Sequence, residues 1–341
     1  MNKVVSSFVF YGMKCSWSVL ACGMVFLMPM PSDAAPTSIA GSPGPCKTMY
    51  FKSVGELDQV LADGNFQIHY AVQGPQAIRN LSDADKNGIP DVVDDIALQL
   101  KTADQLYSGV LRLVHPLRQP RYAHAKHVNV FVLAMAKGNG LAFDEVINDQ
   151  TQNRKSDTGC AIRMYINRDL RPSQNATPAH ELFHLYQYGY AMFKRSGYLE
   201  GLARLAESPF IGKQRAQSAT NWNPADTCTE ILSQSYSASG YWRQRSQELH
   251  LKPIQIPVAL LSRRYSDGRP VLKEQSLNGG KFIQSVLDSL QSASAKVSVT
   301  SGLPLYKWPE KIQRSGRFDQ EMCAAIEKTV QQLDGGVTLL R

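Results

Sequence analysis

The sequence contains no run of five or more lysines and arginines and no motif of a nucleic-acid-binding module. Its formal net charge of +8 therefore predicts a solvated basic surface and no nucleic-acid partner. The sequence also lacks internal repeats, which excludes an array of stacked repeats. Its length of 341 residues and its hydrophobic content of 43% fit a globular protein with a sizeable core.

Cysteine is scarce, with six residues in the whole chain, and no two of them have C-x-x-C spacing. A zinc site made of thiolates is therefore not expected. Two of the cysteines lie in a predicted export signal, and the four that remain are Cys46, Cys160, Cys228 and Cys323. Four cysteines in an exported protein predict two disulfides, but three pairings are open and the sequence does not choose among them.

Residues 1–34 have the pattern of an export signal. Basic residues precede an apolar stretch from Trp17 to Met30, and small residues lead up to Ala34. We expect cleavage after Ala34, which gives a secreted or periplasmic chain without a membrane span that begins at Ala35. An uncleaved membrane anchor and lipidation at Cys22 are the alternatives.

The segment from Thr177 to Tyr190 reads T-P-A-H-E-L-F-H-L-Y-Q-Y-G-Y and contains the pattern H-E-x-x-H. A proline at the first helical position and apolar residues at helical spacing predict a helix here. Four residues along a helix place His180 and His184 on one face, where both imidazoles can bind one ion. Glu181 lies beside them, and in zinc metallopeptidases this carboxylate is the general base. The alternative is a helix with two ordinary histidines.

A catalytic zinc site of this kind needs a third protein ligand. The metzincin pattern would continue with a glycine and a third histidine, but this chain has Gln187 and Tyr190 at those positions. A second helical segment follows after a short connection, and it carries Glu200. We therefore expect a catalytic Zn²⁺ held by His180, His184 and Glu200, with water in the fourth position.

Residues 198–207, Y-L-E-G-L-A-R-L-A-E, resemble the glutamate helix W-L-x-E-G-x-A-x-x-x-E of the aminopeptidase N group of gluzincins. The resemblance implies that Glu200 binds zinc and that Glu207 is its neighbour. Because residues 200, 204 and 207 share a helix face, Glu207 is expected to orient a ligating histidine; a solvated carboxylate is the alternative. Thermolysin-like enzymes carry an aspartate four residues after the ligand glutamate, where this chain has Arg204, so the resemblance to that branch is weaker.

Residues 83–94, D-A-D-K-N-G-I-P-D-V-V-D, form a separate motif. Oxygen-bearing side chains stand at loop positions 1, 3, 5, 9 and 12, a glycine stands at 6, and the residue at 7 can offer its carbonyl. The expected ligands of a structural Ca²⁺ ion are Asp83, Asp85, Asn87, Ile89, Asp91 and Asp94. The terminal aspartate resembles dockerin and thrombospondin type 3 loops rather than an EF-hand. The alternative is an acidic turn that caps the next helix.

The resemblance to gluzincins also predicts parts of a substrate cleft. Zincins place an edge strand above the metal helix, where the substrate backbone pairs with it, and residues 159–167 or 138–140 would supply that strand. Aminopeptidase N enzymes grip the substrate's free amine with a G-x-M-E-N segment, which Gly140–Glu145 does not match. This departure favours an endopeptidase.

Hydrolysis of an amide passes through an oxyanion that needs a hydrogen-bond donor besides the metal. Gluzincins supply a tyrosine or histidine from a later helix. Tyr236, Tyr241 and His250 are the candidates in this chain, and Tyr241 ranks first.

Hydrophobic patterning predicts an α+β fold. Strands are expected at residues 66–72, 128–135, 160–167 and 296–300, and helices at 91–113, 231–245, 280–290 and 318–333. The resemblance implies a zincin-like metallopeptidase with an active-site H-E-x-x-H helix, a small mixed sheet and a mainly helical C-terminal part from about residue 208. A flexible leader at 35–48, rich in Pro, Gly and Ser, is expected before the catalytic domain at 49–341. We expect His69 to be structural, and His124 and His127 to lie on the surface.

The order of the calcium-type loop, a long helix, a strand and the two metal motifs also resembles a group of secreted bacterial gluzincin-like metallopeptidases, over roughly residues 81–241. The predicted function is that of an exported zinc-dependent peptidase acting on a peptide or protein substrate, with endopeptidase activity favoured. The alternatives are a calcium-stabilised surface or adhesive protein without turnover, and a zinc hydrolase of a non-peptide amide or ester.

Overall fold

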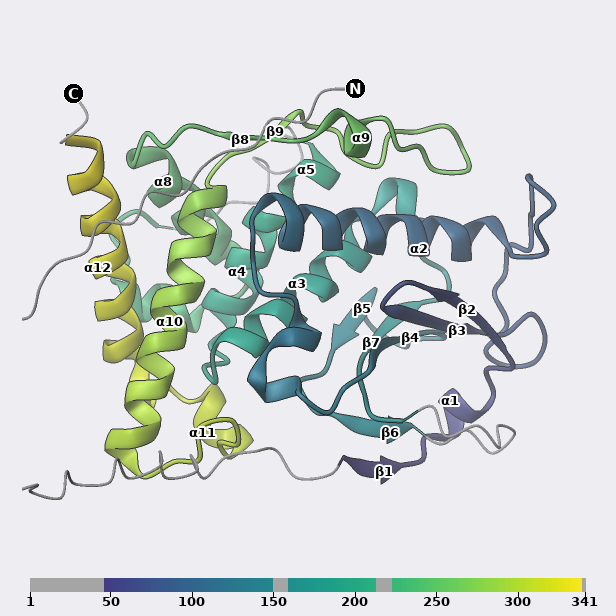
Figure 1. Cartoon of the computed structure of the whole chain (residues 1–341), viewed down its shortest axis with the longest axis horizontal. Coiled ribbons are helices and arrows are strands. Elements are labelled where there is room, and N and C mark those ends of the chain that lie inside the picture. The colour runs from purple at the N-terminus through teal and green to yellow at the C-terminus, as the bar shows by residue number, and fades with distance from the viewer. Residues whose placement is uncertain (1–45, 150–158, 213–222, 339–341) are drawn as a thin grey trace, which may run out of the picture. The chain divides into compact units, whose positions relative to one another are not determined.

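The computed structural model describes residues 46–149, 159–212 and 223–338 (Figure 1). Its strands are β1 (Lys47–Met49), β2 (Gln59–Asp63), β3 (Phe66–Tyr70), β4 (His127–Leu133), β5 (Gly140–Ala142), β6 (Ile147–Asp149), β7 (Ala161–Asn167), β8 (Ile254–Gln255) and β9 (Ser276–Leu277). Its α-helices are α1 (Lys52–Gly55), α2 (Asp91–Asp104), α3 (Thr177–Tyr190), α4 (Ser196–Ala206), α5 (Ser208–Ile211), α7 (Cys228–Ser233), α8 (Ser239–Glu248), α9 (Val258–Leu261), α10 (Gly280–Ser301), α11 (Glu310–Arg314) and α12 (Asp319–Thr338).

Strands β1 to β7 form one mixed sheet in the order β1-β6-β7-β4-β3-β2, and β5 also pairs with β7. β4 runs parallel to β3 and to β7, whereas β5 and β6 are antiparallel to β7. The prediction of an α+β fold with a mixed sheet is confirmed. Among the strands that are described, β5 pairs with β7 alone, so its other edge faces away from the sheet.

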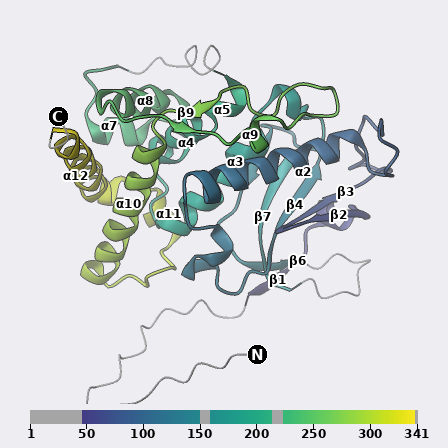
Figure 2. The same cartoon turned by 45° about the horizontal axis from the view of Figure 1, so that its top comes forward.

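β4 is buried on both faces of the sheet. Val128, Val130 and Val132 belong to the large core, which also contains the apolar residues of α2 and α3. Phe131 and Leu133 point to the opposite face, into a smaller cluster that includes Val54 of α1. This two-sided burial explains why the strand reads as a nearly continuous apolar run. Figures 1 and 2 show α2 and α3 lying across the sheet.

Three histidines, His69, His124 and His127, lie in or near the sheet and away from the H-E-x-x-H helix. His69 stacks on Phe131 with ring centroids 4.8 Å apart, and its Nε2 lies 3.2 Å from Asn129 Oδ1. This agrees with the expected structural role. His124 is exposed as predicted, but the prediction is wrong for His127, which is buried because β4 already begins there.

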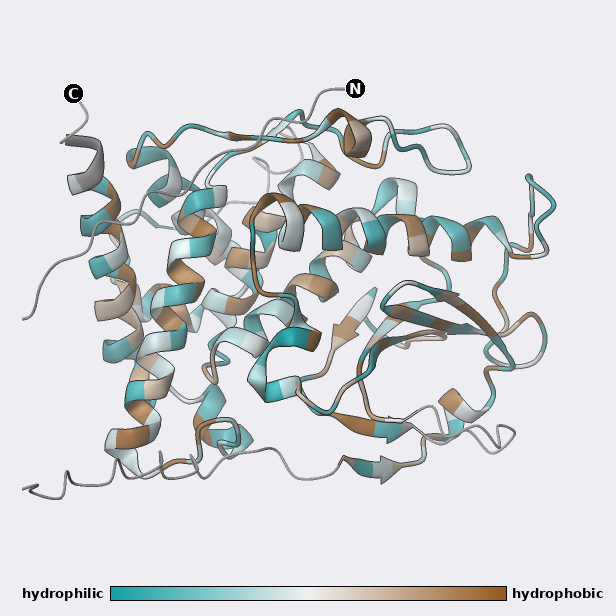
Figure 3. Ribbon diagram, viewed as in Figure 1, coloured by the Kyte–Doolittle hydropathy of each residue, from teal (hydrophilic) through white to brown (hydrophobic). Residues whose placement is uncertain are grey.

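One prediction for the C-terminal part, a strand at residues 296–300, is wrong. These residues belong to α10, which packs beside α12 (Figures 1 and 2). In the helix Val297 is buried, with 3% exposed, while Val299 faces solvent with 82% exposed. The β-branched residues there suggested a strand, but helical packing overrides such a propensity. Figure 3 shows hydrophobic and hydrophilic residues mixed along α10.

The helix predicted at 231–245 is interrupted. α7 ends at Ser233, and Gln234 and Ser235 leave the helical region with ψ values of −174° and −120°. A single turn at Tyr236–Ala238 then leads into α8. This break places Tyr236 and Tyr241 in different surroundings.

Two disulfides are present, as predicted, and the structure pairs Cys46 with Cys160 and Cys228 with Cys323. Such bonds are typical of proteins in oxidising compartments outside the cytoplasm. The flexible leader was expected to extend to residue 48, but Cys46 is bonded to Cys160 and β1, which begins at Lys47, pairs with β6, so the ordered chain begins earlier. The predicted signal at residues 1–34 lies outside the described residues. Every helix in the part of the chain that the structure describes is too short or too polar to span a bilayer.

Candidate metal centre

Helix α3 is buried from Thr177 to Tyr190. Its N-terminus is fixed by neighbouring amides: the Asn175 Oδ1 atom accepts from the Thr177 backbone N–H at 2.9 Å, and Gln99 Oε1 accepts from that of Ala179 at 3.2 Å. These bonds satisfy backbone donors that a helix start leaves open. The first turn of α3 is therefore held in register with α2, so the positions of its two histidines are well defined.

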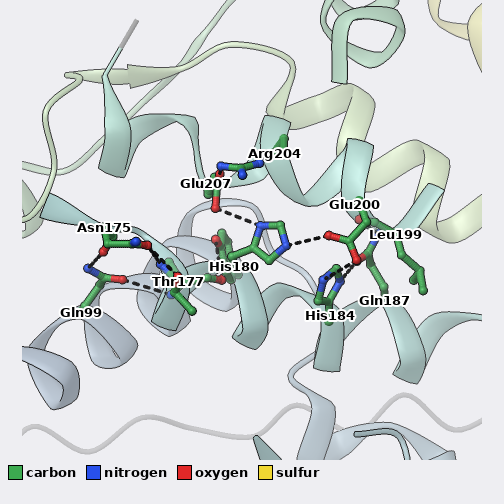
Figure 4. Close-up of polar contacts among 12 residues, drawn as sticks. Gln99, Asn175, Thr177, His180, His184, Gln187, Leu199, Glu200, Arg204 and Glu207 are labelled. Carbon is green, nitrogen blue, oxygen red and sulfur yellow. Dashed lines mark hydrogen bonds and ion pairs between the residues drawn. The ribbon is translucent and has the colours of Figure 1, made fainter. Parts of the chain in front are cut away.

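His180, His184 and Glu200 converge between α3 and α4 (Figure 4). One potential ligand atom from each lies within 4.8 Å of the others, and this is the only such group of three His, Cys, Asp or Glu residues in the described chain. His180 Nε2 is 3.1 Å from Glu200 Oε2, and His184 Nε2 is 3.7 Å from Glu200 Oε1. Two imidazole nitrogens and a carboxylate are a donor set that suits zinc.

The Nδ1 atom of His180 is held from behind by Glu207. The distance to Glu207 Oε2 is 2.9 Å, while Glu207 Oε1 accepts from Arg204 Nη1 at 2.6 Å. Glu207 is only 2% exposed, so the solvated alternative does not apply. A carboxylate on Nδ1 fixes the ring and directs Nε2 toward the convergence point.

The Nδ1 atom of His184 is held by Gln187, a residue that was not predicted to belong to the site. Gln187 Oε1 lies 2.8 Å from His184 Nδ1, and Gln187 Nε2 donates to the carbonyls of Tyr198 and Leu199 at 3.1 and 3.2 Å. One amide therefore links α3 to the turn of α4 just before Glu200. The available sequence signal is its position three residues after His184, on the same helix face.

Burial and neighbouring charges shift the pKa values of these groups in opposite directions. Burial alone would lower the pKa of His180, but Glu207 and Glu200 outweigh it and raise this pKa to about 10. Burial opposes ionisation of Glu200 and Glu207, yet the two histidines hold the pKa of Glu200 below the usual range, and His180 and Arg204 do the same for Glu207. Burial dominates for Glu181, whose pKa is raised despite the two histidines. A raised pKa suits a general base near neutral pH.

A pocket of about 500 Å³ opens beside His180 and Glu181. β5 forms part of its wall at Gly140, where a Cβ atom would lie 2.6 Å from Glu181 Cγ and 2.5 Å from Thr177 Cγ2. Only glycine allows β5 to come this close to α3. Of the two segments predicted to supply an edge strand, residues 138–140 line the pocket and lead into β5, whereas most of the segment 159–167 forms the interior strand β7.

Of the three candidates for the oxyanion donor, Tyr236, Tyr241 and His250, only Tyr236 lines the pocket. Its ring centroid is 6.1 Å from that of His180, and burial together with Glu200 raises its pKa to about 12. Tyr241 instead packs edge-on against Trp242 and beneath Arg245, so its first rank is corrected. His250 is exposed at the end of α8 and does not line the pocket.

Close packing behind Glu200 depends on Gly201. A Cβ atom at residue 201 would lie 2.6 Å from Cδ1 of the fully buried Trp242. The Trp242 indole N–H donates to the Gly197 carbonyl at 2.7 Å, which ties α8 to α4. The glycine after the candidate ligand is thus explained by helix packing.

A buried ion network lies beside the C-terminal end of α3. Asp144 forms ion pairs with Arg121 and with Lys194, the latter at 2.8 Å. Lys194 lies over the ring of Tyr188, which stacks on His184. Although burial opposes it, the two cations lower the pKa of the Asp144 carboxyl.

The loop at residues 83–94 is closed by its own polar groups. Asp83 accepts from the backbone N–H groups of Asn87 and Gly88, and the Asn87 amide donates to Asp85 and Asp94 at 3.2 and 2.9 Å. Asp91 accepts from the backbone of Ala84. α2 begins after Pro90 without a side-chain cap, so the loop is not a capping turn. The Ile89 N–H donates to Asn87 Oδ1.

Comparison of the chain with protein-family models, with curated protein sequences and with solved structures finds no match.

Proposed function

We propose that the protein is an exported, zinc-dependent peptidase of the gluzincin type, with endopeptidase activity favoured. The observation that carries the proposal is the convergence of His180 Nε2, His184 Nε2 and the Glu200 carboxylate, with Glu181 beside them at the pocket. The partners of the two Nδ1 atoms, Glu207 for His180 and Gln187 for His184, support the proposal, because histidines that bind a metal commonly donate their other ring nitrogen to such a group. Two disulfides support an oxidising location.

The zincin-like fold is part of the same proposal. A mixed sheet, an edge strand beside the H-E-x-x-H helix and a mainly helical C-terminal part are what that fold would require. The open edge of β5 near Glu181 would pair with the backbone of an extended peptide.

Bound zinc would act as a Lewis acid that polarises the scissile carbonyl and lowers the pKa of a water molecule. The residues of the chain would carry out the proton transfers. Glu181 would accept a proton from the attacking water and deliver it to the leaving amine nitrogen. The Tyr236 hydroxyl would donate a hydrogen bond to the developing oxyanion.

We propose in addition that the loop at 83–94 binds a structural Ca²⁺ ion. Asp83, Asp85 and Asp94 contact Asn87, Asp91 closes the same loop through Ala84, and rotation of the Asn87 amide would present its oxygen to a cation. The loop leads directly into α2, which supports the N-terminus of α3 through Gln99.

The first experiment is zinc analysis by elemental mass spectrometry of the chain from Ala35, beside Glu200→Ala and Glu181→Gln. We expect about one zinc per chain in the wild type and in Glu181→Gln, and loss of zinc in Glu200→Ala. Digestion of a peptide library should then fall by about 10²- to 10⁴-fold in Glu181→Gln, because that variant keeps the ligands and loses the base.

The outcomes separate the alternatives. A folded wild-type chain without zinc would rule out the enzyme and leave a calcium-stabilised surface protein. A zinc-loaded chain that cleaves no peptide would favour a hydrolase of non-peptide amides or esters. Equal digestion by wild type and Glu181→Gln would refute the assigned role of Glu181.

A further inference from the structure

The pocket beside the metal centre has an asymmetric wall. It includes His180 and Glu181 but not His184, so it extends from the centre toward the N-terminal end of α3. Its remaining polar wall comes mainly from the neutral side chains of Asn139, Gln174 and Asn175. A substrate group that fills this space lies next to the reacting bond.

Arg204 is the one lysine or arginine among the described residues that line this pocket. Its side chain is 39% exposed, and its guanidinium lies 4.8 Å from the ring centroid of Tyr236. In the described part of the chain, its ion pair to Glu207 uses Nη1. A guanidinium carries five N–H donors in a planar fork, so this pairing leaves donors for a second acceptor.

Glu207 does not cancel the charge of Arg204 for a ligand in the pocket. One Glu207 oxygen faces His180 Nδ1 and the other faces Arg204, so a single buried carboxylate is shared between two partners (Figure 4). The ring of Tyr236 holds the guanidinium from a second side. The cation is therefore positioned before a ligand arrives, which lowers the entropic cost of binding.

The start of α3 does not provide a competing anion site. The N–H groups of Thr177 and Ala179 already donate to Asn175 and Gln99, and Pro178 has no N–H. Among the described residues of the pocket wall, the guanidinium of Arg204 is thus the permanently charged donor that an anion would meet, and the other side-chain donors are neutral amides and hydroxyls or His180.

We propose that Arg204 binds a carboxylate of the substrate and makes the enzyme selective for acidic peptides. The inference rests on the proposed peptidase function. The carboxylate comes either from an Asp or Glu side chain next to the scissile bond or from the peptide's C-terminus, because both present the same two oxygens to the guanidinium fork.

The test uses internally quenched peptides in matched pairs on the zinc-loaded chain. One pair replaces Glu by Gln at each position near the scissile bond, and the other replaces a C-terminal acid by an amide. The variants are Arg204→Gln, Arg204→Lys and Arg204→Glu, with Arg314→Gln as the control because Arg314 pairs with Glu310 on the surface of α11. The quantity compared is the ratio of kcat/KM within a pair, so a general loss of zinc or stability cancels.

We expect the wild type and Arg314→Gln to prefer the acidic peptide of one pair. Arg204→Gln should reduce that ratio by about 10- to 100-fold, which corresponds to the loss of a charge-assisted hydrogen bond. Arg204→Lys should retain most of the preference, since it keeps the charge, and Arg204→Glu should favour a Lys-containing peptide. The pair that responds identifies the source of the carboxylate.

A second readout keeps this proposal separate from the peptidase proposal. Fluorescence anisotropy measures binding of the same labelled peptides to zinc-loaded Glu181→Gln, with and without Arg204→Gln. If no peptide is cleaved, the peptidase proposal fails, and a preference for acidic peptides that depends on Arg204 still supports the carboxylate site. Equal binding of acidic and neutral partners, or equal ratios in wild type and Arg204→Gln, overturns the role of Arg204.

Discussion

Gln187 offers a sharp test of how α3 and α4 form one metal site. Gln187→Met removes the acceptor for His184 Nδ1 and the donor to the Tyr198 and Leu199 carbonyls, while it keeps chain length and helix propensity. Those carbonyls can keep their helical bonds, so the main loss is at His184. A buried N–H without an acceptor costs about 1–3 kcal/mol.

This energy translates into weaker metal binding. An outer partner of a ligating histidine typically contributes about 10- to 100-fold in metal affinity, which agrees with the cost of the lost hydrogen bond. We therefore expect the zinc dissociation constant of Gln187→Met to rise by about 10- to 100-fold. The assay is competition for zinc with a chromophoric chelator at fixed pH.

The matched control is Gln313→Met. Gln313 is also buried and donates to a backbone carbonyl, that of Trp308 at 2.8 Å, but it lies in α11 and contacts none of the three ligands. Urea unfolding of both zinc-free variants reports the general loss of stability. A zinc affinity within about threefold of the wild type in Gln187→Met would refute the argument that this amide orients His184.

Three further changes test packing, buried charge and the loop. Gly201→Ala should lower the free energy of unfolding by about 1–3 kcal/mol in urea titrations, because its Cβ presses on Trp242; an unchanged midpoint would contradict this packing. Asp144→Asn should cost about 3 kcal/mol, because it leaves the buried Arg121 without its carboxylate and Lys194 with Glu310 as its remaining acidic partner, whereas Asp169→Asn at an exposed pair should cost about 0–1 kcal/mol. Ca²⁺ at about 100 times its dissociation constant should stabilise the wild type by about 2.7 kcal/mol, which is measured as a rise in Tm. The rise should be smaller in Asp85→Asn. An equal Tm of the wild type with Ca²⁺ and with a chelator would argue against the calcium loop.

The parts of the site that were predictable depend on local geometry. Helical spacing alone brings His180 and His184 to one face, and the short connection to α4 leaves Glu200 within reach. Glu207 follows from the spacing within α4. In each case one or two adjoining helices determine the position, so a sequence pattern is enough to find it.

Other features depend on contacts that no local pattern records. Tyr241 ranks first among the sequence candidates, but two non-helical residues before Tyr236 interrupt the helix expected at 231–245, and Tyr236 is the one that lines the pocket. The strand predicted at 296–300 is helical because α10 packs along α12, and the pairing of Cys46 with Cys160 requires the sheet to form. Gln187 has a visible spacing to His184, yet its bonds to α4 appear only in three dimensions.

The charge balance of the site argues for a cation at its centre. Three carboxylates, those of Glu181, Glu200 and Glu207, meet in a largely buried region with two histidines and one guanidinium, that of Arg204. Without a bound metal, the pKa of His180 is about 10, so His180 and Arg204 carry two positive charges against up to three negative ones. A divalent cation between His180, His184 and Glu200 would take the place of the proton on His180, and with neutral imidazoles it would bring the sum to zero. The three carboxylates are therefore matched in charge to a site that holds a dication together with Arg204.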